Sequence, residues 1–266
     1  IVQNLILSEN KVEEEEALEK LLPMQIDDFK EIFDAMEGLP VTVRLLDPPL
    51  HEFLPRLEEL IEDVARLEEA RDYQQLREKR TLLRKVKNMS EMNPMLGFRG
   101  CRLGILMPSI YEMQMEAIFT AVAELAKEGK DIKPEVMIPL VCNVEELKHL
   151  KDRLIRIAEA EAAFREQAET LEKAGVEIDY LLGTMIELPR AALTAGQIAK
   201  EAEFFSFGTN DLTQTTFGFS RDDAEGKFLH SYLDMNILPE NPFVSIDQNG
   251  VGQLVKIGTE SGRQAR

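Results

Sequence analysis

Two kinds of hydrophobic pattern alternate along the chain. Short apolar runs rich in β-branched residues predict strands, and longer stretches with apolar residues every three or four positions predict helices. The predicted strands cover residues 41–46, 101–107, 135–141, 179–186 and 204–207. The predicted helices cover residues 2–9, 12–21, 27–36, 110–127, 144–174, 190–202 and 252–262. Because a parallel connection needs a crossover segment, this alternation predicts an α/β fold with a parallel sheet.

Residues 55–92 interrupt the alternation. They are dense in Glu, Arg, Lys and Leu at helical spacing, which predicts a solvated pair of helices inserted after the first strand. A length of 266 residues is sufficient for one large α/β domain, and no tandem repeat is present. The first strand, bounded by prolines, is expected to be buried.

Charge and cysteine content narrow the classes of function. The chain has 31 Lys and Arg against 49 Asp and Glu, a net charge of −18, which disfavours binding to nucleic acid or to an anionic membrane. Cys101 and Cys142 are the only cysteines and are expected to be reduced thiols. No basic leader and no long apolar run is present, so we expect a cytoplasmic location. The start at Ile1 rather than Met suggests an internal starting point.

Polar side chains collect where the predicted strands end. Glu187 follows the fourth predicted strand and Asp211 follows the fifth, 24 positions later, about one βα unit. Ligands bind at the carboxyl ends of parallel strands, and two carboxylates there suit Mg²⁺. Arg44 lies late in the first strand and Arg99 precedes the second. Arginine binds phosphate and carboxylate in a bidentate manner, so the set predicts a site for a small dianion with Mg²⁺.

Each of these residues also has a simpler interpretation. Glu187 can be an acid at the start of the helix that follows Pro189, and Asp211 can be part of a helix cap. Arg44 can pair with Asp47 or Asp211 instead of a ligand. Arg99 can be an ordinary loop arginine.

Four segments in order resemble the pyruvate phosphate dikinase family. They read RLLDPPLHEFLP at 44–55, NPMLGFRGCRLG at 93–104, GTMIELPRAAL at 183–193 and FSFGTNDLTQ at 205–214. The resemblance runs from about residue 20 to the end of the chain. The first segment favours the dikinases over phosphoenolpyruvate synthase and sugar-transport enzyme I.

The resemblance implies that residues 1–266 form part of a phosphoenolpyruvate/pyruvate-binding (β/α)₈ TIM-type barrel, with about five of its eight strands. It implies that Glu187 and Asp211 bind Mg²⁺ and that Arg44 and Arg99 contact substrate and act in catalysis. With Glu187, the substrate-binding residues would include Gly208, Thr209, Asn210 and Asp211. This chain departs from the family pattern at two positions: Phe98 stands where the family usually has His, and Ser261 stands where it tends to have Arg.

The same resemblance implies the reaction and the partners. The whole enzyme converts ATP, phosphate and pyruvate to AMP, diphosphate and phosphoenolpyruvate, by way of a phosphohistidine on another domain. The family's proton-donor cysteine lies beyond Arg266, so this chain alone is expected to be inactive. A homodimer is expected, and a plastid is a possible location of the parent protein. The alternatives are a non-catalytic ligand-binding or dimerisation module, and a lyase built on the same barrel.

Overall fold

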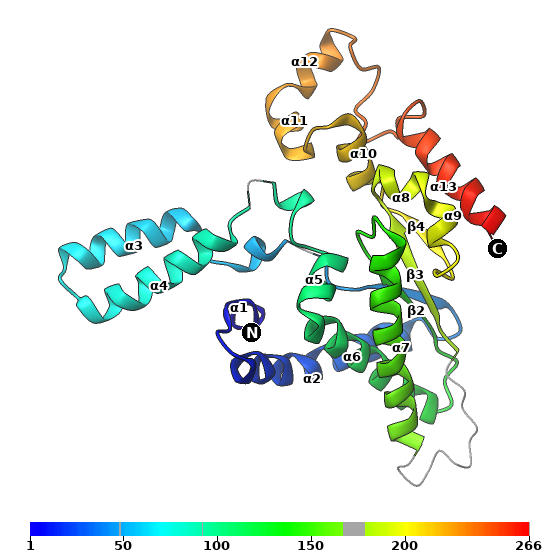
Figure 1. Cartoon of the computed structure of the whole chain (residues 1–266), viewed down its shortest axis with the longest axis horizontal. Helices are drawn as coiled ribbons and strands as arrows, with labels where there is room; N and C mark the ends of the chain where they lie inside the picture. The colour runs from blue at the N-terminus through cyan, green and yellow to red at the C-terminus, as the bar shows by residue number, and fades with distance from the viewer. Residues whose placement is uncertain (48, 92, 167–178, 266) are drawn as a thin grey trace.

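A computed structural model describes residues 1–47, 49–91, 93–166 and 179–265 of the chain. Its centre is a parallel sheet of four strands in the order β1-β2-β3-β4 (Figure 1). The strands are β1 (Pro40–Arg44), β2 (Lys133–Ile138), β3 (Leu181–Ile186) and β4 (Phe205–Phe207). Consecutive strands are neighbours joined by helical crossovers, which is the arrangement of a partial α/β barrel. The predicted fold class is therefore confirmed.

The second predicted strand is wrong. Residues 101–107 contribute the helix α5 (Cys101–Leu106) instead, so the described residues contain four strands rather than five. Gly100, at φ +56, turns the chain before this helix, and Cys101 N–H donates to the Pro139 carbonyl at 3.1 Å. Gly104 fits directly against the ring of Tyr111. The apolar character of this run comes from burial of a short helix against its neighbours, which a single sequence does not distinguish from a buried strand.

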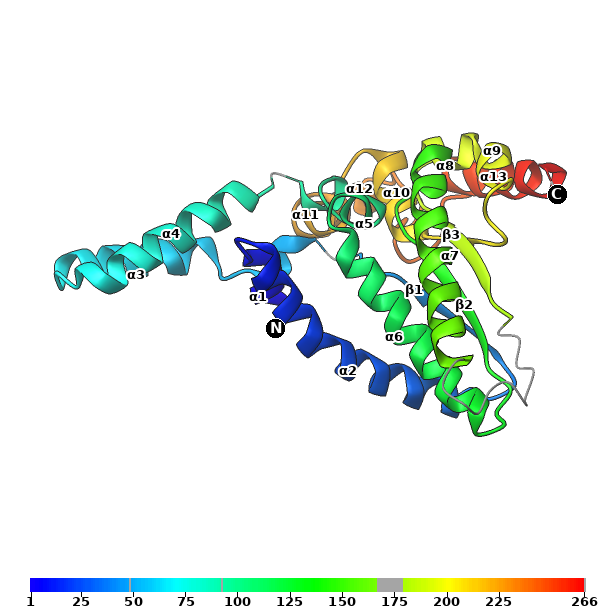
Figure 2. The ribbon, with the colours of Figure 1, turned by 60° about the horizontal axis from the view of Figure 1, so that its bottom comes forward.

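Long helices accompany the sheet in layers. The helix α6 (Pro108–Lys127) packs against both α2 (Lys11–Ala35) and α7 (Val144–Glu166), as Figure 2 shows. The sequence predicts two separate helices, over residues 12–21 and 27–36, whereas α2 runs without a break through Pro23. The last part of the expected helix 144–174, from residue 167 onward, lies outside the described residues. The remaining N-terminal helix is α1 (Val2–Leu7), which packs on α2.

Shorter helices follow β3 and β4. The helix expected over residues 190–202 is two short helices, α8 (Pro189–Leu193) and α9 (Ala195–Ile198), with Thr194 between them. The long helix α13 (Val251–Ala265) packs against both. Between β4 and α13 the chain forms α10 (Thr209–Phe217), α11 (Arg221–Lys227) and α12 (Leu229–Asp234).

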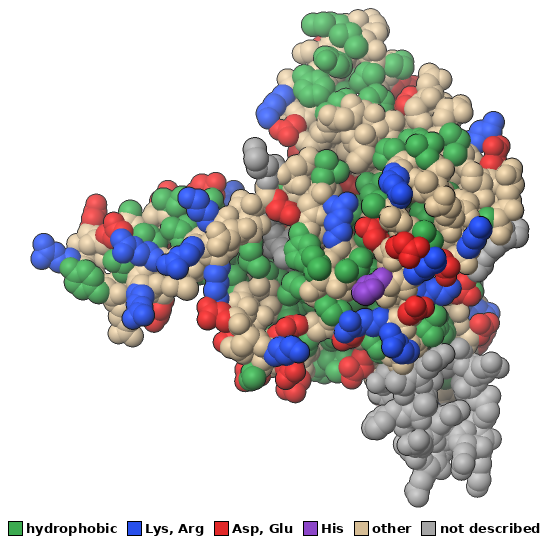
Figure 3. Space-filling view, in the orientation of Figure 1, with side chains coloured by type: hydrophobic (Ala, Val, Ile, Leu, Met, Phe, Trp, Pro, Cys, Tyr) green, Lys and Arg blue, Asp and Glu red, His purple; other side chains and the backbone are tan. Residues whose placement is uncertain are grey.

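The insertion after β1 is the predicted pair of helices. The helices α3 (Leu57–Glu69) and α4 (Tyr73–Met89) pack on each other and project away from the sheet (Figures 1 and 2). Short 3₁₀ turns, η1 (Leu50–Phe53) and η2 (Pro94–Leu96), lie on either side. Figure 3 shows acidic and basic side chains distributed over this hairpin, as expected for a solvated insertion.

The first strand lies at the edge of the sheet and is less buried than expected. Its residues alternate between exposed and half-buried, because successive side chains point to opposite faces of the sheet. Only β2 pairs with it among the described strands. Its inward residues, Val41 and Val43, pack against the core. Within the described residues, every helix is too short or too polar to cross a lipid bilayer.

Candidate functional site

The parallel register brings the carboxyl ends of the four strands to one edge of the sheet. Arg44, the last residue of β1, is in register with Met137 of β2, and Ile186 of β3 with Phe207 of β4. Glu187 follows β3 directly, and Gly208 follows β4. The residues after these strand ends therefore meet at the same edge, as the sequence predicted.

Arg99 is the buried cation at this edge. Its side chain is held mainly by Asp47, which accepts from Nε at 3.1 Å with Oδ1 and from Nη2 with Oδ2. A weaker pair joins the same guanidinium to Asp211, at 3.4 Å from Nη1 to Oδ1 and 3.3 Å from Nη2 to Oδ2. Arg99 is 4% exposed, Asp47 3% and Asp211 8%. Arg99 is therefore a deeply buried bridge between two elements and not an exposed loop arginine.

Glu187 completes the group from the end of β3. It is 1% exposed, and its Oε1 accepts a hydrogen bond of 2.6 Å from the backbone N–H of Leu140. Leu140 lies after β2 and has φ +61, a left-handed conformation that is uncommon for a residue other than glycine. A Cβ at Gly208 would lie 2.6 Å from Glu187 Oε2. Glu187 thus interacts with the loop after β2 and packs against the end of β4, so its role is more than that of an acid at a helix start.

The charges in this group perturb two pKa values. Burial, followed by the negative charges of Asp211 and Asp47, raises the pKa of Glu187 to about 8, although the Leu140 N–H opposes the shift. Burial lowers the pKa of Arg99, but the hydrogen bonds and charge of Asp47 and the charge of Asp211 outweigh it, so its pKa is raised. One arginine therefore does not neutralise the three carboxylates, and Glu187 retains a proton near neutral pH.

This donor set suits a hard divalent cation. Asp47, Glu187 and Asp211 each offer one carboxylate oxygen within 4.8 Å of the others, and all three are buried. Mg²⁺ prefers carboxylate oxygens and uses only one or two from the protein. A bound divalent cation would oppose the effects of burial and of the charges of Asp211 and Asp47, which raise the pKa of Glu187. The residues present therefore fit the ion.

The other predicted residues lie around this buried group. Arg44 is at the rim, with its side chain 48% exposed and its Nη1 3.6 Å from Asp47 Oδ2. Thr209 and Asn210 are exposed in the first turn of α10, directly before the buried residues of that helix, which begin at Asp211. Asp211 lies in the same turn, and among the described residues no side chain caps the start of this helix. The simpler interpretation of Asp211 as part of a cap therefore finds no support.

A pocket of about 420 Å³ opens beside Asp211. Its wall combines the loop before Arg99 with α10 and the start of α11, through residues that include Met95, Leu96, Gln214 and Phe219. Gln214 Nε2 donates to Asp211 Oδ1 at 3.3 Å, and its Oε1 accepts from Arg221 N–H at 2.9 Å. This pocket is an opening through which a small molecule can approach Asp211.

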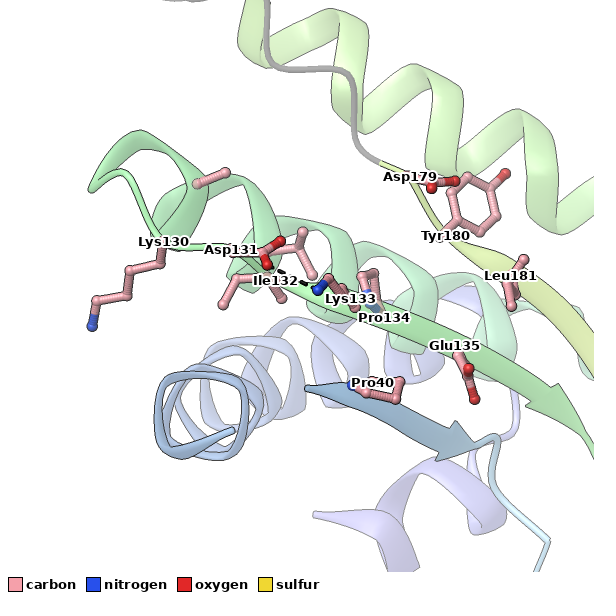
Figure 4. Close-up of a pocket in the computed structure, with 12 residues that line it drawn as sticks. Pro40, Lys130, Asp131, Ile132, Lys133, Pro134, Glu135, Asp179, Tyr180 and Leu181 are labelled. Carbon is pink, nitrogen blue, oxygen red and sulfur yellow. Dashed lines mark ion pairs between the residues drawn. The ribbon is translucent and has the colours of Figure 1, made fainter. Parts of the chain in front are cut away.

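A separate pocket of about 400 Å³ lies at the opposite, amino ends of the strands (Figure 4). Its charged residues are partly paired with one another, as in the 2.9 Å ion pair of Lys133 with Asp131. Glu135 accepts a hydrogen bond from Thr42 Oγ1. Since the buried carboxylate group lies at the other end of the strands, we assign the candidate site to the carboxyl ends.

Two parts of the site were not assigned from the sequence. The sequence indicates Asp47 only as a possible partner of Arg44, yet Asp47 forms the shortest contacts with Arg99. The Leu140 N–H was missed because the predicted third strand extended to residue 141, whereas β2 ends at Ile138. The Pro139 that ends this strand was the available signal, because proline is excluded from the middle of a sheet.

A comparison with protein families places the whole chain in one family. The chain belongs to the family described as PEP-utilising enzyme, PEP-binding domain, whose model matches residues 3–266.

Similar proteins include pyruvate, phosphate dikinase of Rhizobium meliloti, 51% identical over 100% of this chain and 28% of that protein. The pyruvate, phosphate dikinase of Entamoeba histolytica is 48% identical over 100% of this chain and 29% of that protein. Pyruvate, phosphate dikinase 1, chloroplastic, of Arabidopsis thaliana is 49% identical over 100% of this chain and 26% of that protein. The chain thus spans between a quarter and a third of the length of these relatives.

Proposed function

We propose that the carboxyl-end group is the phosphoenolpyruvate/pyruvate site of a pyruvate, phosphate dikinase. The observation that carries this proposal is a buried arginine among three buried carboxylates in a chain of the PEP-binding family. The names of the similar proteins support the same activity. A lyase on the same barrel has no comparable support.

The proposed chemistry is phosphoryl transfer between phosphoenolpyruvate and a phosphohistidine on another domain. The P–O bond of phosphoenolpyruvate breaks, the phosphoryl group passes to the histidine, and the enolate of pyruvate remains to be protonated at carbon. The whole enzyme would convert ATP, phosphate and pyruvate to AMP, diphosphate and phosphoenolpyruvate. For such transfers, positioning and neutralisation of charge supply most of the rate enhancement.

Each residue of the site has a proposed role. Arg99 and Arg44 would bind the phosphate and carboxylate of the substrate and neutralise charge as it develops. Glu187 and Asp211 would hold Mg²⁺, which when bound supplies a Lewis acid for the enolate oxygen. Gly208, Thr209 and Asn210 would also line the substrate-binding pocket.

Binding of phosphoenolpyruvate to the chain tests this function directly. We expect calorimetry to detect phosphoenolpyruvate binding in Mg²⁺, and Glu187→Gln and Asp211→Asn to lose it while folding normally. Asp131→Asn, an exposed carboxylate at the other end of the sheet, is the matched control and should bind like the parent chain. Absence of binding in the unmodified chain would contradict the proposed site.

Activity is tested in the full-length enzyme, because this chain alone is expected to show no turnover. There, Glu187→Gln or Asp211→Asn should lower kcat by about 100-fold or more, as loss of a charge-stabilising group does. Near-normal activity in both variants would refute the Mg²⁺ assignment.

The remaining partners and the location are part of the same proposal. The partners would be phosphoenolpyruvate or pyruvate, the phosphohistidine domain and a second copy of the chain in a homodimer, which sedimentation would detect. Two free cysteines suit a reducing compartment, either the cytoplasm or a plastid as in the chloroplastic relatives.

A further inference from the structure

Asp47 has two conceivable roles at the candidate site. It is one of the three carboxylates near enough to share a metal ion, and it is also the main partner of Arg99. These roles compete because a carboxylate oxygen that accepts from a guanidinium is less available to a cation. The contacts of its two oxygens discriminate between the roles.

Both oxygens of Asp47 are committed to arginines. Oδ1 accepts from Arg99 Nε at 3.1 Å, and Oδ2 accepts from Arg99 Nη2 and lies 3.6 Å from Arg44 Nη1. Arg99 Nε also donates to the Asp47 backbone carbonyl at 3.1 Å. One buried carboxylate is thus shared by the two arginines proposed to bind substrate.

Asp211 holds Arg99 in a different way. Both of its contacts with the guanidinium are 3.3 to 3.4 Å, near the limit for a hydrogen bond. The other contacts of Arg99 Nη1 are also long, at 3.4 Å to the Met95 carbonyl and 3.7 Å to its sulfur. The Nη1 side of the guanidinium is therefore the side that can exchange its partners for a ligand.

The backbone that carries Asp47 is itself fixed by α6. Both backbone groups of the preceding residue, Leu46, are bound by buried side chains of this helix. Its N–H donates to Gln114 Oε1 at 2.7 Å, and its carbonyl accepts from the Tyr111 hydroxyl at 2.9 Å. Tyr111 is fully buried, so this support does not depend on a mobile side chain.

We propose that Asp47 is a positioning residue that anchors Arg99 and Arg44, and not a metal ligand. This assignment rests on the proposed function for the identity of the ligand. In it, Arg99 keeps its Asp47 contacts throughout, and only the weaker Asp211 contacts are released when the cation and phosphoenolpyruvate bind. The carboxylates left for the cation are Glu187 and Asp211.

Cation binding separates this role from that of a ligand. Mn²⁺ is the probe, followed by electron paramagnetic resonance, with Asp47→Asn, Asp211→Asn and the control Asp131→Asn. We expect Asp47→Asn to keep its Mn²⁺ dissociation constant within about threefold of the parent chain, and Asp211→Asn to weaken it about tenfold or more. An equal loss in both variants would make Asp47 a ligand and overturn the proposal.

The anchoring role is read from Arg99 itself. Phenylglyoxal modifies accessible arginines, and peptide mass spectrometry reports each one. In the parent chain Arg99 should be protected, whereas the half-exposed Arg44 reacts. In Asp47→Asn we expect Arg99 to react at least about tenfold faster, and phosphoenolpyruvate affinity to fall by a similar factor, which is the size expected for one charged hydrogen bond. Unchanged protection of Arg99 would refute the anchoring role.

Two further comparisons keep the result decisive. If Asp47→Asn does not fold, Tyr111→Phe serves instead, because it removes the hydrogen bond to the Leu46 carbonyl. This variant should raise the labelling of Arg99 with no change in Mn²⁺ affinity. Unchanged labelling of Arg99 in Tyr111→Phe would count against the proposal. If the parent chain binds neither Mn²⁺ nor phosphoenolpyruvate, the proposed function fails. The labelling of Arg99 then still decides whether Asp47 anchors it.

Discussion

At the scale of single residues, Glu187 is the group whose charge state is most constrained by the fold. Its pKa is about 8, compared with 4.5 as the ordinary value, because burial and the charges of Asp211 and Asp47 disfavour the carboxylate. The folded chain therefore holds a proton that the unfolded chain releases at a lower pH. Proton binding and folding are consequently linked at this residue.

The linkage predicts the pH dependence of stability without metal. Below pH 4.5 Glu187 is protonated in both states, and its contribution is fully present. Between pH 4.5 and about 8 only the unfolded state loses the proton, so the free energy of unfolding falls by about 1.4 kcal/mol per pH unit from this group. Urea unfolding in EDTA should show a flatter profile for Glu187→Gln than for the parent chain.

The other carboxylates contribute a slope common to both proteins, so the difference between them is the measured quantity. Glu128→Gln is the matched control, because Glu128 is on the surface and its side chain is 55% exposed. It should follow the parent chain. The assignment of the pKa to burial of Glu187 would be wrong if Glu187→Gln and the parent chain had parallel profiles.

Gly208 is the residue that allows Glu187 to occupy its position. A Cβ there would lie 2.6 Å from Glu187 Oε2 and 2.7 Å from the sulfur of Met185, which is closer than real Cβ contacts. We expect Gly208→Ala to displace the Glu187 carboxylate and to weaken Mn²⁺ binding by about tenfold, or about 1.4 kcal/mol. Titration followed by electron paramagnetic resonance measures this.

Gly226→Ala provides the control for that substitution. Gly226 lies within α11, and beyond the helix's own backbone no described atom lies within 4 Å of a Cβ added there, so alanine should leave Mn²⁺ binding unchanged and favour the helix slightly. Equal Mn²⁺ affinities for Gly208→Ala and Gly226→Ala would show that Glu187 is not a ligand or that it moves without cost.

At the scale of elements, α2 is a helix that tolerates a proline. Pro23 lies inside the 25-residue helix and is exposed, so it lacks one helical hydrogen bond and its ring opposes regular geometry. We expect Pro23→Ala to raise the free energy of unfolding by about 1 to 3 kcal/mol, measured by urea denaturation. The exposed neighbour Met24 gives the control Met24→Ala, which should change stability little.

A loss of stability in Pro23→Ala would indicate that a bend at Pro23 is needed. The helix α2 packs along α6, and a bend at the proline can follow the surface of that neighbour. In that case straightening the helix would cost more in packing than it adds in helical hydrogen bonding.

How much of the fold the sequence predicts depends on the kind of element. The sequence predicts the four observed strands to within three residues at each end, and it predicts the hairpin of α3 and α4, because short apolar runs and dense charged helices are strong local signals. The strand predicted at 101–107 failed because α5 is buried by contacts made far along the chain. Cys101 N–H, for example, meets the Pro139 carbonyl, 38 positions away.

In the candidate site, too, the sequence predicts features that local patterns encode and misses those that depend on contacts between distant residues. Glu187 and Asp211 lie together because they follow neighbouring parallel strands, which end at one edge. Arg99 reaches them from the loop before α5, where a strand was wrongly predicted, so strand-end reasoning does not account for its place. The anchoring of Arg99 by Asp47 depends on a loop that approaches from 52 positions away, and no local pattern encodes that approach. The left-handed conformation at Leu140 was likewise invisible to periodicity.

At the scale of the whole molecule, the described sheet has two outer edges, on β1 and β4, to which no described strand is paired. Unpaired edges present backbone N–H and carbonyl groups that can pair with another chain. The net charge of −18 opposes such contact by repulsion, and salt screens that repulsion. The chain should therefore self-associate more as ionic strength rises.

The edge of β1 can be tested with one charged side chain. Thr42 is an exposed residue of β1 whose hydroxyl donates to Glu135, so Thr42→Lys introduces an edge lysine beside an existing acidic partner. Lysine blocks edge pairing because pairing would bury its charge. Sedimentation velocity at high salt should show less self-association for Thr42→Lys than for the parent chain.

Thr81→Lys on the exposed face of α4 makes the same change in net charge away from the sheet, and it should associate like the parent. If the two variants behave alike, net charge rather than the β1 edge controls the association, and the surface that joins the copies lies elsewhere.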